Sequence, residues 1–179
     1  MINKEIKYEG KFLRLINNNS WEYVERTNCN GAVVIISMNK KNEVLLVEQF
    51  RQPVAKNVIE FPAGLISDSG VEEKAEVAAL RELEEETGYI AEKITFLTSG
   101  PTAPGLSTEM ISFVLAEGLE KVSEGGGVES ESIIIHEVPI NKIDTWLKHR
   151  QQEGKLVDLK VYGGLYFLRD RTSRTSHAY

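Results

Sequence analysis

The sequence has almost no cysteine, no long apolar run and no excess of positive charge. Its single cysteine, Cys29, cannot form an internal disulfide, so we expect a reducing, cytoplasmic environment. No apolar stretch approaches the roughly 20 residues that a membrane helix needs, and the first residues lack the apolar core of a secretion signal. We therefore expect no contact with a membrane. The formal net charge of −6 argues against a binder of nucleic-acid polymers, which is normally basic.

What is present suits one globular domain, because the chain has 179 residues, of which 41% are hydrophobic. Short β-branched, apolar segments predict strands, and apolar residues spaced by one helical turn predict helices. Strands are expected within a hairpin at 12–26 and at 32–36, 44–50, 57–61, 94–97, 110–115 and 133–138. Helices are expected at 71–87, 140–152 and 156–169.

The most informative stretch is the acidic end of the helix predicted at 71–87. Glu82 and Glu86 are one helical turn apart, and Glu85 lies beside both. Three carboxylates on one surface repel each other, which costs helix stability unless they hold a divalent cation such as Mg²⁺. Arg81 can pair with Glu85, or with Glu73 further up the helix, and hold the carboxylates in place. The alternative is a solvated acidic face, because glutamate is a good helix former.

This stretch resembles the signature of the Nudix family, G-x5-E-x7-R-E-U-x-E-E-x-G-U, in which U is a bulky apolar residue. Gly64 opens the signature, Glu73 precedes seven residues, and 81–89 matches its second half, with Gly88 as the helix stop. Eight residues rather than five separate Gly64 from Glu73. Three residues are thus inserted in the loop, and Glu72 becomes a rival for the place of Glu73.

The resemblance implies a cofactor and its ligands. Glu82, Glu85 and Glu86 are the implied metal ligands, with the carbonyl group of Ala63 as a further one. Mg²⁺ is the implied ion, and Mn²⁺ is the substitute that we would expect. Such an ion would neutralise a diphosphate, orient it and activate water.

The resemblance also implies a fold of the α/β class. We expect an α/β/α sandwich with a mixed central sheet and an N-terminal β extension. The expected divisions are 1–28 for the extension, 29–170 for the hydrolase domain and 171–179 for a polar tail that frays. The extension is the segment through which related enzymes form homodimers, so a homodimer is implied too.

Residues outside the signature resemble the ADP-ribose pyrophosphatase branch of the family. The matching segments are 48–53, 59–66 and 104–109. They imply that Arg51 and Glu60 bind substrate, the first as a bidentate phosphate ligand and the second as an acceptor for ribose hydroxyl groups. Trp21 stands where related enzymes stack a tryptophan on adenine. The alternatives are a surface ion pair for Arg51 and a core position for Trp21.

The catalytic base of related enzymes lies on a mobile loop well after the signature. Here the glycines at 125–127 lead into an acidic segment, and glycine hinges suit a loop that closes over substrate. Glu131 lies nearest the following strand and fits best, with Glu129 second. A solvated acidic loop without a catalytic role is the alternative.

Taken together, the resemblance implies a Mg²⁺-dependent pyrophosphohydrolase that cleaves the diphosphate of a nucleoside-diphosphate sugar. ADP-ribose, cut to AMP and ribose 5-phosphate, is the best candidate substrate. The alternatives are GDP-mannose, another nucleotide sugar or a dinucleotide, because selectivity depends on pocket contacts that spacing does not define. A non-catalytic nucleotide-binding domain and a protein-interaction domain are the rivals from other classes.

Overall fold

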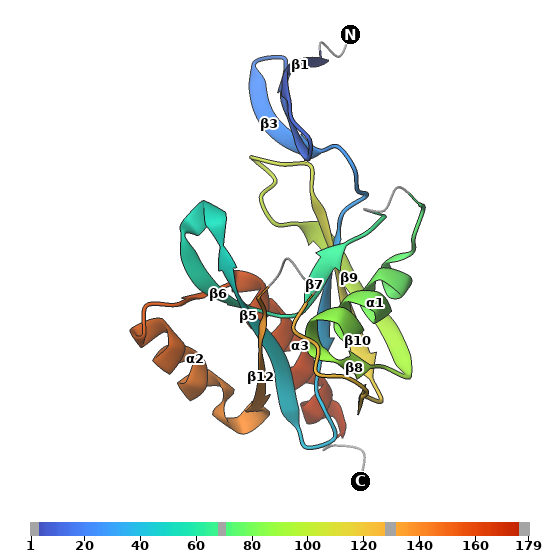
Figure 1. Cartoon of the computed structure of the whole chain (residues 1–179), viewed down its shortest axis with the longest axis vertical. Helices are drawn as coiled ribbons and strands as arrows, with labels where there is room; N and C mark the ends of the chain where they lie inside the picture. The colour runs from blue at the N-terminus through green and yellow to red at the C-terminus, as the bar shows by residue number, and fades with distance from the viewer. Residues whose placement is uncertain (1–3, 68–70, 128–131, 176–179) are drawn as a thin grey trace.

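The computed structural model describes residues 4–67, 71–127 and 132–175, and its three helices lie on both sides of two four-stranded sheets (Figure 1). The helices are α1 (Ala75–Thr87), α2 (Ile143–Gln152) and α3 (Leu159–Thr175). Short 3-10 turns, η1 (Gln52–Val54) and η2 (Ile140–Lys142), follow β5 and β12. The strands are β1 (Lys4–Glu9), β2 (Leu13–Asn18), β3 (Trp21–Arg26), β4 (Ala32–Ser37), β5 (Glu43–Arg51), β6 (Lys56–Glu60), β7 (Ala63–Leu65), β8 (Tyr89–Ile90), β9 (Lys93–Pro101), β10 (Met110–Glu117), β11 (Glu120–Lys121), β12 (Ile134–Pro139) and β13 (Leu156–Val157).

Both four-stranded sheets are mixed. One has the order β7-β4-β10-β9, in which β10 runs parallel to β4 and the other pairs are antiparallel. The other has the order β12-β5-β6-β13, in which only β13 runs parallel to its neighbour. The α/β class predicted from the sequence is confirmed, but the mixed sheet that we expected at the centre is divided in two. The division follows from β5, which pairs with β12 and β6 rather than along β4.

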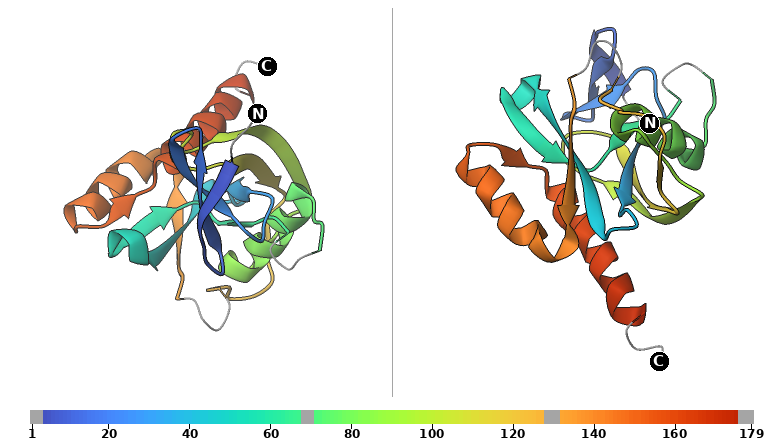
Figure 2. Two further views of the ribbon diagram at one scale, coloured as in Figure 1. Left: turned by 90° about the horizontal axis from the view of Figure 1, so that it is seen from above. Right: turned by 60° about the horizontal axis from the view of Figure 1, so that its bottom comes forward.

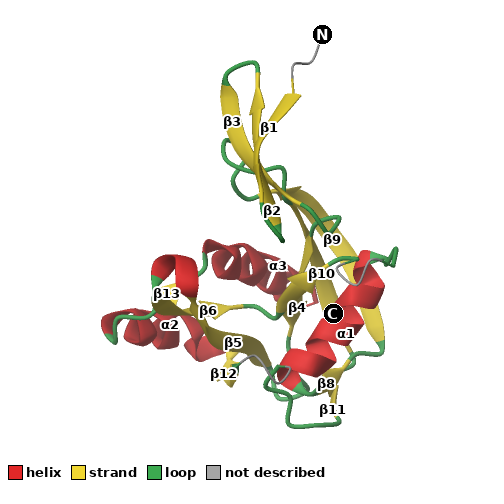
Figure 3. Cartoon of the chain, turned by 45° about the horizontal axis from the view of Figure 1, so that its top comes forward, coloured by secondary structure: helices red, strands yellow, loops and turns green. Residues whose placement is uncertain are grey.

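Strand β4 shows why its sequence is apolar without alternation. Val33 and Ile35 pack toward α1, whereas Val34 and Ile36 pack toward α2 and α3, and all four are buried. Successive side chains of a strand point to opposite faces, so a strand covered on both faces needs apolar residues at every position. Helix α1 lies on one side of the sheets, and α2 and α3 lie on the other (Figure 3). This is the α/β/α arrangement that the sequence predicted.

A separate sheet of β1, β2 and β3 projects from one end of the molecule (Figure 1). The sequence predicted a hairpin for β2 and β3 but missed β1, whose side chains are all exposed and so carry no burial pattern. Backbone hydrogen bonds join this sheet to the body, because Val24 N donates to Leu106 O at 2.8 Å and Thr108 N donates to Val24 O at 3.2 Å. The large apolar side chains that are exposed on this sheet and on its turn between β1 and β2 are Ile6, Tyr8, Phe12, Leu13 and Trp21.

Two predicted helix starts were too early. Helix α1 begins at Ala75 rather than at 71, because residues 71–74 are not helical and Glu73 N donates to Ser67 Oγ at 2.9 Å instead. Helix α3 begins at Leu159 because the two residues of β13 pair with β6 instead.

Of the predicted ends of α1 and α3, one was correct and the other was wrong. The predicted stop at Gly88 is confirmed, with φ at 73°. The end predicted for α3 was wrong, because the helix continues to Thr175, beyond the sheets (Figure 2), and includes the first part of the tail expected to fray. No proline or glycine interrupts it after Gly164. Within the described ranges, no helix combines the length and hydropathy that a bilayer-crossing segment requires.

Candidate active site

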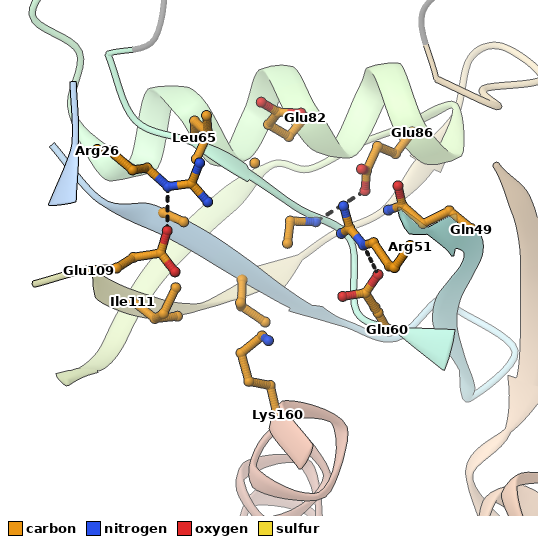
Figure 4. A pocket seen from close by; sticks show the side chains of 14 residues that line it. Arg26, Gln49, Arg51, Glu60, Leu65, Glu82, Glu86, Glu109, Ile111 and Lys160 are labelled. Atoms are coloured by element: carbon orange, nitrogen blue, oxygen red, sulfur yellow. Dashed lines mark hydrogen bonds and ion pairs between the residues drawn. The ribbon is translucent and has the colours of Figure 1, made fainter. Parts of the chain in front are cut away.

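A cavity of about 440 Å³ lies where α1, β4, the ends of β5 and β6, and the start of α3 meet (Figure 4). Charged side chains of both signs line it. The carboxylates are Glu60, Glu82, Glu86 and Glu109, and the cationic groups are Arg26, Arg51 and Lys160. A cavity with this mixture suits an anionic ligand that binds together with a metal cation, since the cations meet the anion directly and the carboxylates meet the metal.

Strand β7 and helix α1 approach each other closely at this cavity. A Cβ atom on Gly64 would lie 1.9 Å from Cδ of Glu82, so only glycine leaves room for the Glu82 side chain in its present position. One residue earlier, Ala63 N donates to Glu86 Oε2 at 3.1 Å. Glu86 is only 4% exposed. The backbone at 63–64 therefore orients two of the three carboxylates that the sequence predicted as metal ligands.

Arg81 connects the acidic side chains of α1 to the preceding loop. Its Nη1 donates to Glu82 Oε1 at 2.8 Å and to Glu85 Oε2 at 3.3 Å, and its Nη2 contacts Glu73 Oε2 and Leu65 O, each at 3.3 Å. Burial lowers the pKa of Arg81, but its hydrogen bond to Glu73 and the charge of Glu82 outweigh burial and raise that pKa above its ordinary value. Arg81 therefore stays cationic and acts as a positioning residue. Of the two rivals in the loop, Glu73 is the one that pairs with it.

The predicted metal ligands are brought together only in part. Glu82, Glu86 and Ala63 line the cavity, whereas Glu85 lies beside Arg81 and the glycine-rich loop at 123–127. Among residues 4–67, 71–127 and 132–175, no three acidic, histidine or cysteine side chains converge as a metal-ligand set. The donors that line the cavity are nevertheless oxygen atoms, which Mg²⁺ prefers, and Mg²⁺ usually keeps several waters and phosphate oxygens as ligands. The donor set therefore fits an ion that the substrate helps to bind.

Arg51, the last residue of β5, and Glu60, the last residue of β6, form an ion pair. Arg51 Nε donates to Glu60 Oε2 at 2.7 Å, and both side chains line the cavity beside Glu86 (Figure 4). The sequence left open whether Arg51 forms a surface ion pair or lines a site. In the structure it does both, because it pairs with Glu60, lines the cavity and keeps 43% of its side chain exposed.

Sequence reasoning missed four polar residues that line the cavity: Arg26, Gln49, Glu109 and Lys160. Arg26 Nε donates to Glu109 Oε1 at 2.5 Å across a sequence separation of 83 residues, which no local pattern can reveal. Lys160 is in the first turn of α3, and no sequence pattern distinguishes it from an ordinary surface lysine. For Glu109 the only signal was its place in the 104–109 segment.

Trp21 lies outside this cavity. Its side chain is 63% exposed at the turn between β2 and β3, whereas Arg26, at the other end of β3, lines the cavity. The strand between them spans about 17 Å at the usual rise per residue. Trp21 is therefore neither the core residue that the sequence left as an alternative nor a neighbour of the carboxylates in the same chain.

Both predicted catalytic bases, Glu129 and Glu131, lie outside the described residues. The backbone on either side of them is anchored near the end of α1. Gly126 N donates to Glu86 O at 2.9 Å, Gly127 N donates to Glu85 O at 3.0 Å, and Ile133 N donates to Gly126 O at 3.3 Å. Gly126 and Gly127, which we expected to act as hinges, therefore supply amide groups for carbonyls that a helix end leaves without partners.

A buried ionic cluster supports the strand that carries Arg51. Glu48 is 1% exposed and accepts hydrogen bonds from Asn57 Nδ2 at 2.7 Å and Lys155 Nζ at 2.8 Å, and its carboxylate lies 3.0 Å from His136 Nε2. Burial raises the pKa of Glu48, but these hydrogen bonds, with that of Lys155 the strongest, lower it to about 2. The cluster ties β5 to β6, to β12 and to the turn before β13.

Comparisons with known proteins agree with this geometry. The model of the NUDIX domain family matches residues 29–158. A methanol dehydrogenase activator from Bacillus methanolicus is 37% identical over 122 residues, which are 68% of this chain and 64% of that protein. The ADP-ribose pyrophosphatase of Bacillus subtilis (strain 168) is 36% identical over 104 residues, or 58% of this chain and 55% of that protein. The match therefore spans less than two thirds of either relative.

Two further comparisons extend over more of the chain. The GDP-mannose pyrophosphatase of Yersinia pestis (strain Pestoides F) is 31% identical over 147 residues, which are 77% of this chain and 72% of that protein. A crystal structure of an ADP compounds hydrolase superposes with a TM-score of 0.77 and covers 98% of this chain and 95% of its own, at 22% identity. At that identity the likeness supports the fold alone.

Proposed function

The chain belongs to the Nudix family, and from that premise we propose that it is a Mg²⁺-dependent pyrophosphohydrolase of nucleoside-diphosphate sugars. ADP-ribose, cut to AMP and ribose 5-phosphate, is the substrate that we propose first. The observation that carries the proposal is the cavity in which Glu82 and Glu86 face Arg51 and Lys160. The names of the relatives from Bacillus subtilis and Yersinia pestis support a nucleotide sugar as the class of substrate.

In the proposed reaction, water attacks one phosphorus atom and the bond from that phosphorus to the bridging oxygen breaks. Arg51 binds the phosphate oxygens, and its pairing with Glu60 orients the guanidinium group toward them. Glu82 and Glu86 would hold the cation, with Arg81 as their positioning residue. A bound Mg²⁺ would offset the charge of the diphosphate and activate the attacking water.

Glu131 is the residue that we propose as the acceptor of the proton from this water, with Glu129 as the second candidate. The proposal is supported by the position of the residues that flank them. Gly127 and Ile133 are anchored by backbone hydrogen bonds close to the end of α1, one turn beyond Glu82.

We further propose a homodimer formed through the sheet of β1, β2 and β3. Five large apolar side chains are exposed on this small sheet and on its turn between β1 and β2, and exposed apolar groups commonly mark a protein interface. Trp21 is one of them. It can contact a substrate base only in the cavity of a second copy, so its predicted stacking role depends on the dimer.

Two alternatives remain within the family. GDP-mannose, another nucleotide sugar or a dinucleotide would present the same diphosphate to the same charged groups, and the relative from Yersinia pestis favours GDP-mannose among them. A non-catalytic nucleotide-binding domain would keep the cavity without turnover. The cytoplasmic location predicted from the single cysteine stays a prediction.

The test is a screen of the purified protein with Mg²⁺, and separately with Mn²⁺, against ADP-ribose, ADP-glucose, UDP-glucose and GDP-mannose. Release of the nucleoside monophosphate is the readout. Glu86→Gln should lose at least about 100-fold in turnover while its thermal unfolding is unchanged, because removing a metal ligand's charge removes stabilisation of the transition state. Glu84→Gln, on the exposed face of the same helix, is the matched control.

Each outcome of the screen is informative. Absence of monophosphate release from every substrate would contradict the enzyme assignment and favour the nucleotide-binding alternative. Similar activity of Glu86→Gln and Glu84→Gln would contradict the site but leave the reaction standing.

A further inference from the structure

The buried carboxylate of Glu48 takes no part in the proposed reaction and does not line the cavity. Along β5, Gln49 and Arg51 line the cavity, whereas Glu48 points to the opposite face, because successive side chains of a strand alternate. On that face its partner His136 contacts the ring of Trp146 in α2 edge-on, with the ring centroids 4.9 Å apart. Glu48 can therefore act on the cavity only through the strands and turns that it holds.

Three elements besides β5 supply the partners of this carboxylate. Asn57 from β6 donates to it at 2.7 Å, Lys155 from the turn before β13 donates at 2.8 Å, and His136 from β12 lies 3.0 Å away. These elements and β5 belong to one sheet with the order β12-β5-β6-β13 (Figure 3). One buried charge thus contacts three strands of this sheet and the turn that leads into the fourth.

A buried charge tolerates little movement of its partners. A carboxylate removed from water is stable only while its oxygen atoms keep their hydrogen-bond donors. Burial raises the pKa of Glu48, but the hydrogen bonds from its donors lower it to about 2, so the carboxylate is charged at neutral pH. Apolar side chains of similar size are often at least as stable in such a place, so stability alone does not account for the charge. What the charge adds is a defined position for each donor.

Two of these positions concern the strands β5 and β6. The hydrogen bond between Glu48 and Asn57 joins the two strands, and three positions further along each strand Arg51 pairs with Glu60. The two pairs lie on opposite faces of the same strands, because three positions along a strand reverse the direction of the side chain. A shift of one strand along the other would therefore disturb both pairs together.

The third position concerns the first turn of α3. Lys155 is followed by β13, which pairs with β6. Asp158 comes next, and its amide donates to Ile59 O at 3.0 Å, while its carboxylate pairs with the ammonium group of Lys160. The place of Lys160 at the cavity therefore depends on where the turn at Lys155 is held.

We propose that Glu48 and Lys155 are positioning residues for substrate binding. Their ion pair fixes the strands and the turn that place Arg51, Glu60 and Lys160 at the cavity. The proposal rests on the proposed function, since it assigns these groups to the binding of its substrate. The carboxylates that would hold the cation belong to α1, which supplies none of the hydrogen-bond partners of Glu48 among the described residues. Loss of the ion pair should therefore weaken substrate binding more than the chemical step.

The first experiment is the steady-state kinetics of Lys155→Met, which keeps an unbranched apolar side chain and removes the ammonium group. KM for the best substrate should rise at least about fivefold while kcat stays within about twofold, because loss of uniform binding raises KM alone. Lys155→Arg keeps a cation and should hold KM within about twofold of the wild-type value. Lys93→Met is the matched control, because Lys93 pairs with Glu117 at 3.8 Å and does not line the cavity.

A role in stability alone predicts a different result. Ile36→Val removes one carbon atom from a fully buried core residue of β4, so it should lower the melting temperature and leave KM unchanged. The proposal is overturned if Lys155→Met behaves in the same way, with reduced stability and an unchanged KM. It is overturned as well if Lys93→Met raises KM as much as Lys155→Met does.

The two residues of the ion pair should also act as one unit. Glu48→Gln should raise KM by a factor similar to that of Lys155→Met, and the double variant should raise it no further, because both changes remove the same interaction. Effects on KM that simply multiply would overturn the proposal. Asn57→Ala removes another donor to the same carboxylate and replaces either variant if that variant fails to fold.

A measurement without substrate separates this proposal from the proposed function. The Nε–H signal of Arg51 in ¹⁵N NMR spectra, assigned by its loss in Arg51→Lys, reports the hydrogen bond to Glu60. The signal should shift in Lys155→Met and keep its place in Lys93→Met. If the wild-type protein cleaves no nucleotide sugar, the proposed function fails, and this shift still decides whether the ion pair positions Arg51. A signal that stays in place in Lys155→Met overturns the proposal.

Discussion

Replacing Gly64 by alanine would displace Glu82 without altering any charge. The added Cβ atom would lie 1.9 Å from Cδ, 2.0 Å from Oε1 and 2.3 Å from Cγ of Glu82. Ordinary contact begins at 3.4 Å, so the carboxylate has to retreat by about 1.5 Å. The clashing atoms belong to the far end of a flexible side chain, so the glutamate can move while the backbone stays in place.

The expected loss follows from this displacement. A misplacement of about 1 Å at a catalytic group can cost on the order of 100-fold in rate. We therefore expect kcat/KM for the best substrate to fall about 100-fold, which corresponds to about 2.7 kcal/mol at 25 °C. Stability should change by about 1 kcal/mol or less, because alanine also reduces the conformational entropy of the unfolded chain and Gly64 does not have a positive φ.

Steady-state kinetics with Mg²⁺ and thermal unfolding of Gly64→Ala provide the test. Gly100→Ala is the control, because a Cβ atom there would meet nothing within 4 Å. In the background of Glu82→Gln, the alanine should cost little more, since two changes that act through one carboxylate are not additive. Full activity of Gly64→Ala, or a loss that simply adds to that of Glu82→Gln, would refute the reasoning. Loss of the fold would show that the backbone cannot accept the methyl group.

Three further predictions concern other parts of the molecule. Glu131→Gln should slow turnover with little effect on metal affinity measured by titration, and an unchanged rate would move the base to Glu129 or elsewhere. Glu48→Gln should destabilise the protein on the order of 3 kcal/mol at pH 7, because the pKa of Glu48 is lowered from 4.5 to about 2 by folding. A lowered pKa adds stability above the unfolded value, and that stability is lost as the pH falls from about 4.5 through about 2. Urea unfolding at pH 7 and pH 3 should show a smaller difference between wild type and variant at pH 3, and an equal difference at both would contradict the assignment. Light scattering should give twice the mass of the 20.1 kDa chain, and Trp21→Asp together with Tyr8→Asp should shift it toward the monomer, whereas a monomeric wild-type protein would rule out the proposed dimer.

Local patterns in the sequence were sufficient for much of the fold. The apolar run at 32–36 identified a strand buried on both faces, and Gly88 marked the end of α1. The acidic segment at 81–86 identified the helix that carries the cavity carboxylates, because spacing along a helix decides which side chains share a face. Patterns failed where burial was absent or where pairing was distant, as in β1 and β13.

Tertiary structure decided which side chains line the cavity. Arg26 and Glu109 meet across 83 residues, and Lys160 reaches the cavity from a helix whose start depends on the pairing of β13 with β6. The sequence shows no periodic pattern that would identify such neighbours, because their contact depends on how separate elements pack. The sequence by itself determined which carboxylates one helix could present. Only the packing of β7 against that helix decided that Glu82 and Glu86, and not Glu85, line the cavity, because close approach at Gly64 and the hydrogen bond from Ala63 act on those two side chains alone.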